Sequence, residues 1–78
     1  MEIVIKLVNY TEVAKVIAQA KELKAKVIWE RDGEYGTQDL RVLAKFQKEG
    51  FNISVSTHEG KYSDEAITVE FWLAEDKP

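Results

Sequence analysis

Hydrophobic and polar residues alternate along three stretches of the chain with the two-residue period that is typical of β-strands. Residues 2–8, 52–58 and 66–73 each place apolar side chains at every second position. In residues 2–8 both sets of positions are largely apolar, so we expect this strand inside the sheet rather than at its edge. A fourth strand is predicted at residues 26–31, around the apolar run Val27-Ile28-Trp29.

Two further stretches repeat their apolar residues with the period of an amphipathic α-helix. The first covers residues 12–24 and the second runs from about residue 37 to residue 49. The side chains expected to face inward are Val13, Val16, Ile17, Ala20 and Leu23 in the first helix, and Leu40, Leu43, Ala44 and Phe46 in the second.

Capping and turn residues separate these elements. Thr11 is predicted to cap the first helix, and Thr37 or Asp39 the second, because their side-chain oxygens can accept free backbone N–H groups. Gly50 is placed to end the second helix in the left-handed conformation. Residues 59–65 form a polar loop that joins the last two strands.

The resulting order, β-α-β-α-β-β, predicts a two-layer α/β sandwich. Right-handed crossovers place both helices on one face of a four-stranded mixed sheet and leave the other face open. Residues 1–78 are expected to form a single compact domain, with residues 74–78 as a frayed tail. The element order is similar to that of the C-terminal domain of bacterial translation initiation factor 3 and of several small RNA-binding or sulfur-relay domains. The resemblance covers the whole chain as element order alone, so no residue role is transferred.

Composition removes several classes of function. The chain has no cysteine, which excludes disulfides, thiolate metal sites and the chemistry of a sulfur relay. It shows no signal peptide and no apolar run of membrane-spanning length, which favours a cytoplasmic protein that does not bind membranes. No nucleotide-binding loop, metal-ligand spacing or catalytic arrangement is present, so we expect no cofactor, no metal and no enzymatic activity.

The first candidate site is the edge where the parallel strands end, because open α/β sheets usually bind ligands there. Tyrosines gather at this edge, and tyrosine gives rigid, amphipathic contact area. The candidate residues are Asn9, Tyr10, Asp32, Tyr35, His58 and Tyr62. The competing interpretation, which the common half-burial of tyrosines favours, is that these tyrosines only cover the ends of the core. Two weaker alternatives are that His58 acts in acid–base chemistry and that Asp32 with Glu34 and Asp64 binds a cation.

Two broader surfaces are also candidates. A face of the helices that could hold phosphates would consist of Lys15, Lys21, Lys24, Arg41, Lys45 and Lys48. The open sheet face would carry Val4, Val8 and Trp72, together with Trp29 if Ile28 points toward the helices. An apolar patch on that face could join two copies of the chain as a homodimer or could bind another protein.

The sequence therefore favours a small non-enzymatic domain, for which two hypotheses remain open. One is an idealised or de novo designed scaffold, since caps, helix stop and strand alternation all agree with a single fold. The other is a protein-binding or regulatory module. Nucleic-acid binding through the basic helix face or the open-face tryptophans is a third alternative, which the net charge of −3 disfavours.

Overall fold

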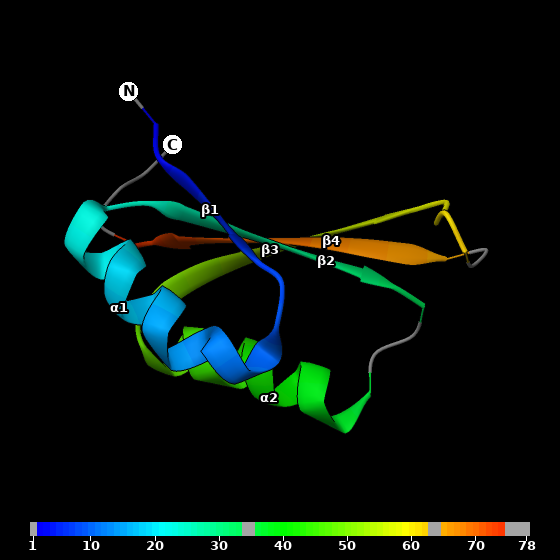
Figure 1. Ribbon diagram of the computed structural model, residues 1–78, viewed down its shortest axis with the longest axis horizontal. Helices are drawn as coiled ribbons and strands as arrows, with labels where there is room; N and C mark the ends of the chain where they lie inside the picture. Colours follow the sequence, from blue (N-terminus) through cyan, green and yellow to red (C-terminus); the bar gives the residue numbers. More distant parts are fainter. Residues whose placement is uncertain (1, 34–35, 63–64, 75–78) are drawn as a thin grey trace.

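The computed structural model describes residues 2–33, 36–62 and 65–74 of the chain. Its elements are β1 (Val4–Leu7), the 3₁₀ turn η1 (Tyr10–Glu12), α1 (Val13–Leu23), β2 (Lys26–Asp32), α2 (Thr37–Lys48), β3 (Phe51–His58) and β4 (Ala66–Leu73). Both helices lie on the same side of the four-stranded sheet (Figure 1). The predicted element order and α/β sandwich are therefore confirmed. The predicted frayed tail falls, beyond residue 74, outside the described residues.

The strand order across the sheet is β1-β2-β4-β3. β1 is parallel to β2, and β4 lies antiparallel between β2 and β3. The two strand–helix–strand units thus keep their parallel directions, but β2 and β3 are not neighbours. The expectation that residues 2–8 lie inside the sheet is wrong: β1 is an edge strand, and Val4 and Val8 are exposed on the open face.

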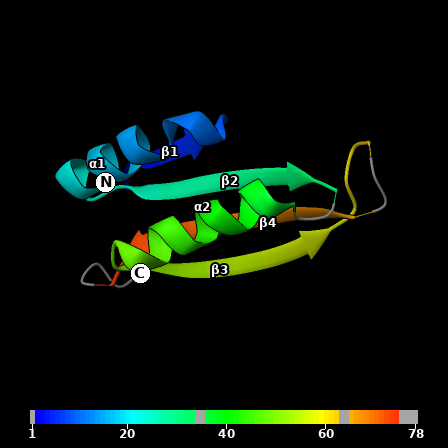
Figure 2. The ribbon, with the colours of Figure 1, turned by 90° about the horizontal axis from the view of Figure 1, so that it is seen from below.

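The core lies between the sheet and the helices. Phe46 of α2 stacks on Phe71 of β4 with a centroid distance of 3.9 Å and meets Phe51 of β3 edge-to-face at 5.2 Å. α2 therefore sits across β3 and β4, and Figure 2 shows it in front of that part of the sheet. In the second helix the inward prediction holds for Phe46 and partly for Leu43, whereas Leu40 and Ala44 are exposed.

The register of the sheet decides the direction of Trp29. Ile28 pairs with Lys6 on one side and with Glu70 on the other, in a row on the open face. Because neighbouring residues of a strand point to opposite faces, Trp29 points toward the helices, where it is buried in the core. The placement of Trp29 on the open face is therefore wrong.

The helix ends correct two capping predictions. Asn9, not Thr11, caps the turn that begins the first helical segment: its side chain accepts the backbone N–H and the hydroxyl of Thr11. In α2 the N-cap is Gly36, and the Asp39 carboxylate accepts the Gly36 N–H at 2.6 Å. The prediction for Gly50 agrees with the structure, in which its φ is 91°.

α1 ends on a non-glycine residue in the left-handed region. Lys24 has φ 53°, and the N–H of Ala25 reaches back to the Ala20 carbonyl at 2.9 Å. Replacing Lys24 with glycine is expected to stabilise the domain by about 0.5–1 kcal/mol, because glycine adopts this conformation without strain. Chemical denaturation measures the change. Lys24→Ala is the matched control: it removes the same side chain without relieving the backbone and should not stabilise.

Candidate functional site

Two hollows adjoin at the edge of the sheet where β1 and β2 end. One, of about 360 Å³, lies on the side of α2, and the other, of about 460 Å³, lies on the side of the β3–β4 loop. Val8, Glu30 and Arg31 line both. Tyr10 lines the first hollow and Tyr62 the second. We call Val8, Tyr10, Arg31 and Tyr62, with the two hollows, the carboxyl edge.

Apolar side chains at the carboxyl edge are unusually open to solvent. Val8 is 82 % exposed, Tyr62 83 % and Tyr10 48 %. Val8 follows the last residue of β1, and Tyr62 projects from the loop after β3. Val8 and Tyr10, from the segment after β1, and Tyr62, from a distant loop, therefore border the same pair of hollows, as expected from the topology of the strands.

Arg31 is held in place between the hollows. It follows Val27 and Trp29 on the helix side of β2, and its Nε donates to Asp39 Oδ2 at 3.0 Å. The same carboxylate oxygen accepts the N–H of Gly36, so one buried aspartate joins the end of β2 to the start of α2. This contact fixes the distance between the two elements that form the first hollow.

Tyr10 and Tyr62 are positioned by different contacts. The hydroxyl of Tyr10 accepts a hydrogen bond from Gln38 Nε2 at 3.0 Å, which links η1 to α2. The backbone N–H of Tyr62 donates to Asp32 Oδ2 at 2.9 Å, and the Lys61 ammonium lies 5.4 Å from the Tyr62 ring. Both tyrosines are thus oriented by contacts at their base or tip while their rings stay accessible.

The structure brings together most of the predicted edge residues, but in two groups. Asp32, His58 and Tyr62 line the second hollow, and Tyr10 lines the first. Asn9 acts as a cap beside Tyr10. Tyr35 lies outside the described residues, as do Glu34 and Asp64 of the proposed cation site. The notion that the tyrosines cover the core fails for Tyr62, whose ring is almost fully exposed.

His58 has partners at both ring nitrogens. Nδ1 lies 3.1 Å from the carbonyl oxygen of Glu59, and Nε2 lies 2.8 Å from the hydroxyl of Thr68. Because a carbonyl oxygen can only accept, the neutral ring carries its proton on Nδ1 and Nε2 accepts from Thr68. These contacts anchor His58 at the end of the β3–β4 hairpin.

The open face is polar rather than continuously apolar. Lys26 pairs with Glu70 at 3.0 Å and Lys6 with Glu30 at 3.8 Å. Hydrogen bonding to Glu70 raises the pKa of Lys26. Val4, paired with Lys26, and Trp72, paired with Asn52, are therefore separated from Val8 by charged rows. Val4, Val8 and Trp72 therefore do not form one continuous apolar patch on the open face.

The basic residues of the helices do not gather into one face. Lys21 pairs with Glu49, and this contact lowers the pKa of Glu49. Lys15 and Lys21 are six positions apart and lie about 120° apart around α1. Arg41 and Lys45 instead line a groove between the helices. Lys24 and Lys48 are exposed near the ends of their helices.

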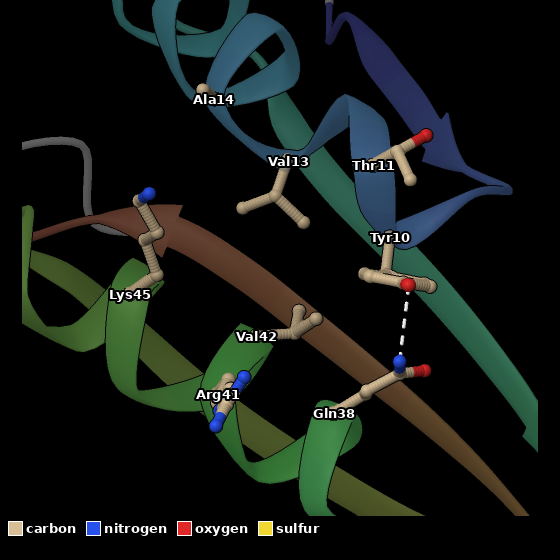
Figure 3. A pocket seen from close by; sticks show the side chains of 8 residues that line it. All are labelled: Tyr10, Thr11, Val13, Ala14, Gln38, Arg41, Val42 and Lys45. Carbon is tan, nitrogen blue, oxygen red and sulfur yellow. Dashed lines mark hydrogen bonds between the residues drawn. The ribbon is translucent and has the colours of Figure 1, made fainter.

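The groove between α1 and α2 has a volume of about 290 Å³. Figure 3 shows Val13 and Val42 between the two helices, with Arg41 and Lys45 on the α2 wall. The Tyr10–Gln38 hydrogen bond closes the end where both helices begin, and the Lys21–Glu49 ion pair joins the end where both finish. The two contacts show that the helices run parallel and are tied at both ends.

No model of a known protein family, no curated protein and no solved structure matches the chain. Among the described residues, no group of three or more His, Asp or Glu side chains is arranged to hold a metal ion. Neither helix of the described segments is both long and apolar enough to cross a membrane.

Two members of the carboxyl edge, Val8 and Arg31, are not among the edge residues predicted from the sequence. Arg31 ends a predicted strand, and Val8 is predicted for the open sheet face. A partial signal for Arg31 does exist: it follows Val27 and Trp29 at two-residue spacing, so it lies on their side of the strand, and an aspartate occurs near the start of the next helix. The contact between Gln38 and Tyr10 has no such signal, because the two residues are 28 positions apart.

Proposed function

We propose that this chain is a non-enzymatic binding domain that recognises an extended segment of another protein at the carboxyl edge. The observation that carries the proposal is the exposure of Val8 and Tyr62, at 82 % and 83 %, beside two adjoining hollows. Exposed aromatic and aliphatic side chains at a concave surface are typical of interface residues. Tyrosines are favourable there because ordering them costs little conformational entropy.

The form of the edge supports an extended ligand. The hollows have about 360 Å³ and 460 Å³, and they share the wall formed by Val8, Glu30 and Arg31. Volumes of this size fall in the range of pockets that bury small groups. A chain lying across the shared wall could place one apolar side chain in each hollow, with Val8 between them.

The proposal is tested by selecting peptides from a displayed random library on the wild-type protein. Peptides that bind the carboxyl edge should lose about tenfold or more in affinity with Val8→Ser and with Tyr62→Ser. Val4→Ser is the matched control, because Val4 is an exposed valine at the other end of β1 and lines neither hollow. Val8 and Tyr62 are exposed, so neither substitution should unfold the domain.

Three results bear on the proposal. Loss of binding with both edge variants, and not with the control, supports it. Enriched peptides that bind all variants equally would place the binding surface elsewhere and overturn it. A library that yields no specific peptide would favour the alternative of an idealised scaffold with no partner.

A further inference from the structure

One surface of this highly charged chain carries no charged residue at all. Charged residues make up 32 % of the sequence, yet none occurs from Phe51 to Thr57 along β3. The neighbouring side of α2 is equally uncharged. Its residues are Leu40, Leu43, Ala44 and Gln47. We call these α2 and β3 residues the neutral seam.

Helix geometry places most of these α2 residues on the side of β3. Arg41 and Lys45 face the groove toward α1. At about 100° per residue, Leu43 and Gln47 fall on the opposite side of the helix, and Leu40 lies about 100° from Arg41. Ala44 lies only about 60° from Arg41 and borders the basic side. Figure 2 shows that this side of α2 looks toward β3, the edge strand farthest from α1. The basic side of α2 thus faces the groove toward α1, and the neutral side faces the edge of the sheet formed by β3.

The seam leaves large apolar groups open to solvent. Leu40 is 57 % exposed and Val55 is 48 % exposed. Leu43 and Ile53 are half-buried and pack against the core beside them. The apolar stripe of α2 is therefore wider than the part that the monomer covers, which also explains why Leu40 has the sequence pattern of an inward residue.

The backbone of β3 has an open hydrogen-bonding edge. Gly50 accepts the N–H of Ala74 at 3.4 Å, so the pair Gly50 and Ala74 is of the hydrogen-bonded kind. Such pairs recur at every second residue of an antiparallel ladder. The even-numbered residues of β3 therefore bond to β4. The N–H and C=O groups directed outward belong to Phe51, Ile53, Val55 and Thr57.

A second contact gives the same assignment independently. Gly33 donates to the carbonyl of Glu65 at 2.9 Å, which makes the odd-numbered residues of β4 the ones that bond to β2. The even-numbered residues of β4 are left for β3, as inferred above. β1, the other edge strand, has only four residues and includes Lys6, whereas β3 has eight residues and no formal charge. β3 is thus the edge that is open to pairing with another strand.

We propose that β3 pairs antiparallel with β3 of a second copy of this chain, with Ser54 on the two-fold axis. This register places Ile53 opposite Val55 of the other copy and Phe51 opposite Thr57. The outward N–H and C=O groups of both strands then bond to each other. Apolar side chains meet on the helix side, and Asn52, Ser54 and Ser56 meet on the open side.

The positions of the helices fit a second copy in particular. Neighbouring strands lie about 4.8 Å apart. Because α2 sits across β3 and β4, the two α2 helices would lie about two strand spacings apart, close to the 8–10 Å at which helices pack. Their neutral sides would face each other and bury Leu40, while Arg41 and Lys45 stay outside. No like charges meet, so the surface suits its own copy.

Hydrogen exchange of the wild-type protein gives the most direct test. The amides of Ser54 and Ser56 should be protected at every concentration, because they bond to β4. Those of Ile53 and Val55 should exchange rapidly in dilute protein and become protected as the concentration rises from about 10 µM to about 1 mM. Protection of Ile53 and Val55 that does not change with concentration would overturn the proposal, as would a chain that stays monomeric throughout.

A pair of matched substitutions tests the location of the interface. Val55→Lys and Val4→Lys change the same residue type at nearly the same exposure, 48 % and 47 %, on opposite edge strands. In analytical ultracentrifugation Val55→Lys should weaken dimerisation by about tenfold or more, and Val4→Lys should leave it unchanged. The reverse result would move the interface to β1 or the open face. The dimer does not use the carboxyl edge, so either proposal can fail without the other.

Discussion

Replacing Phe46 with alanine is expected to cost about 3–5 kcal/mol of unfolding free energy. Phe46 is fully buried, stacks on Phe71 at 3.9 Å and meets Phe51 at 5.2 Å. Truncation would leave a cavity between α2 and the strands β3 and β4, where rigid aromatic neighbours limit collapse. A domain of this size is stabilised by only about 5–15 kcal/mol, so the variant should be close to unfolded.

Urea denaturation followed by circular dichroism measures this loss. Leu40→Ala is the control on the same helix, because the sequence pattern assigns both residues to the interior whereas the structure exposes Leu40. Leu40→Ala should change the stability of the monomer by about 0.5 kcal/mol or less when measured in dilute protein. Equal losses for the two variants would mean that α2 is rotated relative to the placement described here.

The contrast between Phe46 and Leu40 shows what periodicity can and cannot predict. A helical period locates the apolar stripe, but the width of the stripe that is buried depends on the partner surface. Leu40 borders the stripe and is left uncovered because β3 is the last strand on that side, whereas Ala44 lies about 160° from Phe46 around the helix and faces away from the sheet. The same limit applies to Val4 and Val8, whose apolar character suggested an interior strand although β1 lies at the other edge.

Local signals predicted the order of elements and most of their bounds. They could not predict that β4 lies between β2 and β3, because that order depends on pairings between distant segments. The direction of Trp29 was open for a related reason: the run Val27-Ile28-Trp29 has no alternation, and only the register with Lys6 and Glu70 resolves it. At the carboxyl edge, the strand ends predicted where Tyr10 and Tyr62 lie, whereas the hydrogen-bond partners of Arg31 and Tyr10 could be identified only from the fold.

Asp39 supports the carboxyl edge from beneath, and Asp39→Ala is expected to destabilise the domain by about 2 kcal/mol. Its buried carboxylate accepts both the Gly36 N–H at 2.6 Å and the Arg31 guanidinium at 3.0 Å. Alanine removes both bonds, one of which satisfies a backbone donor at the start of α2. Asp39→Asn keeps an acceptor but not the charge, so its loss should be about half as large.

Thr37→Ala is the control for this prediction. Thr37 was the alternative cap in the sequence, but it is exposed and the N-cap is Gly36, so its replacement should change stability by about 0.5 kcal/mol or less. Equal effects of Thr37→Ala and Asp39→Ala in urea denaturation would contradict the capping role of Asp39.

Asp39→Asn should also lower the affinity of the peptides selected on the carboxyl edge, because Asp39 holds Arg31, which forms part of the wall between the two hollows. Unchanged affinity with reduced stability would confine Asp39 to a structural role.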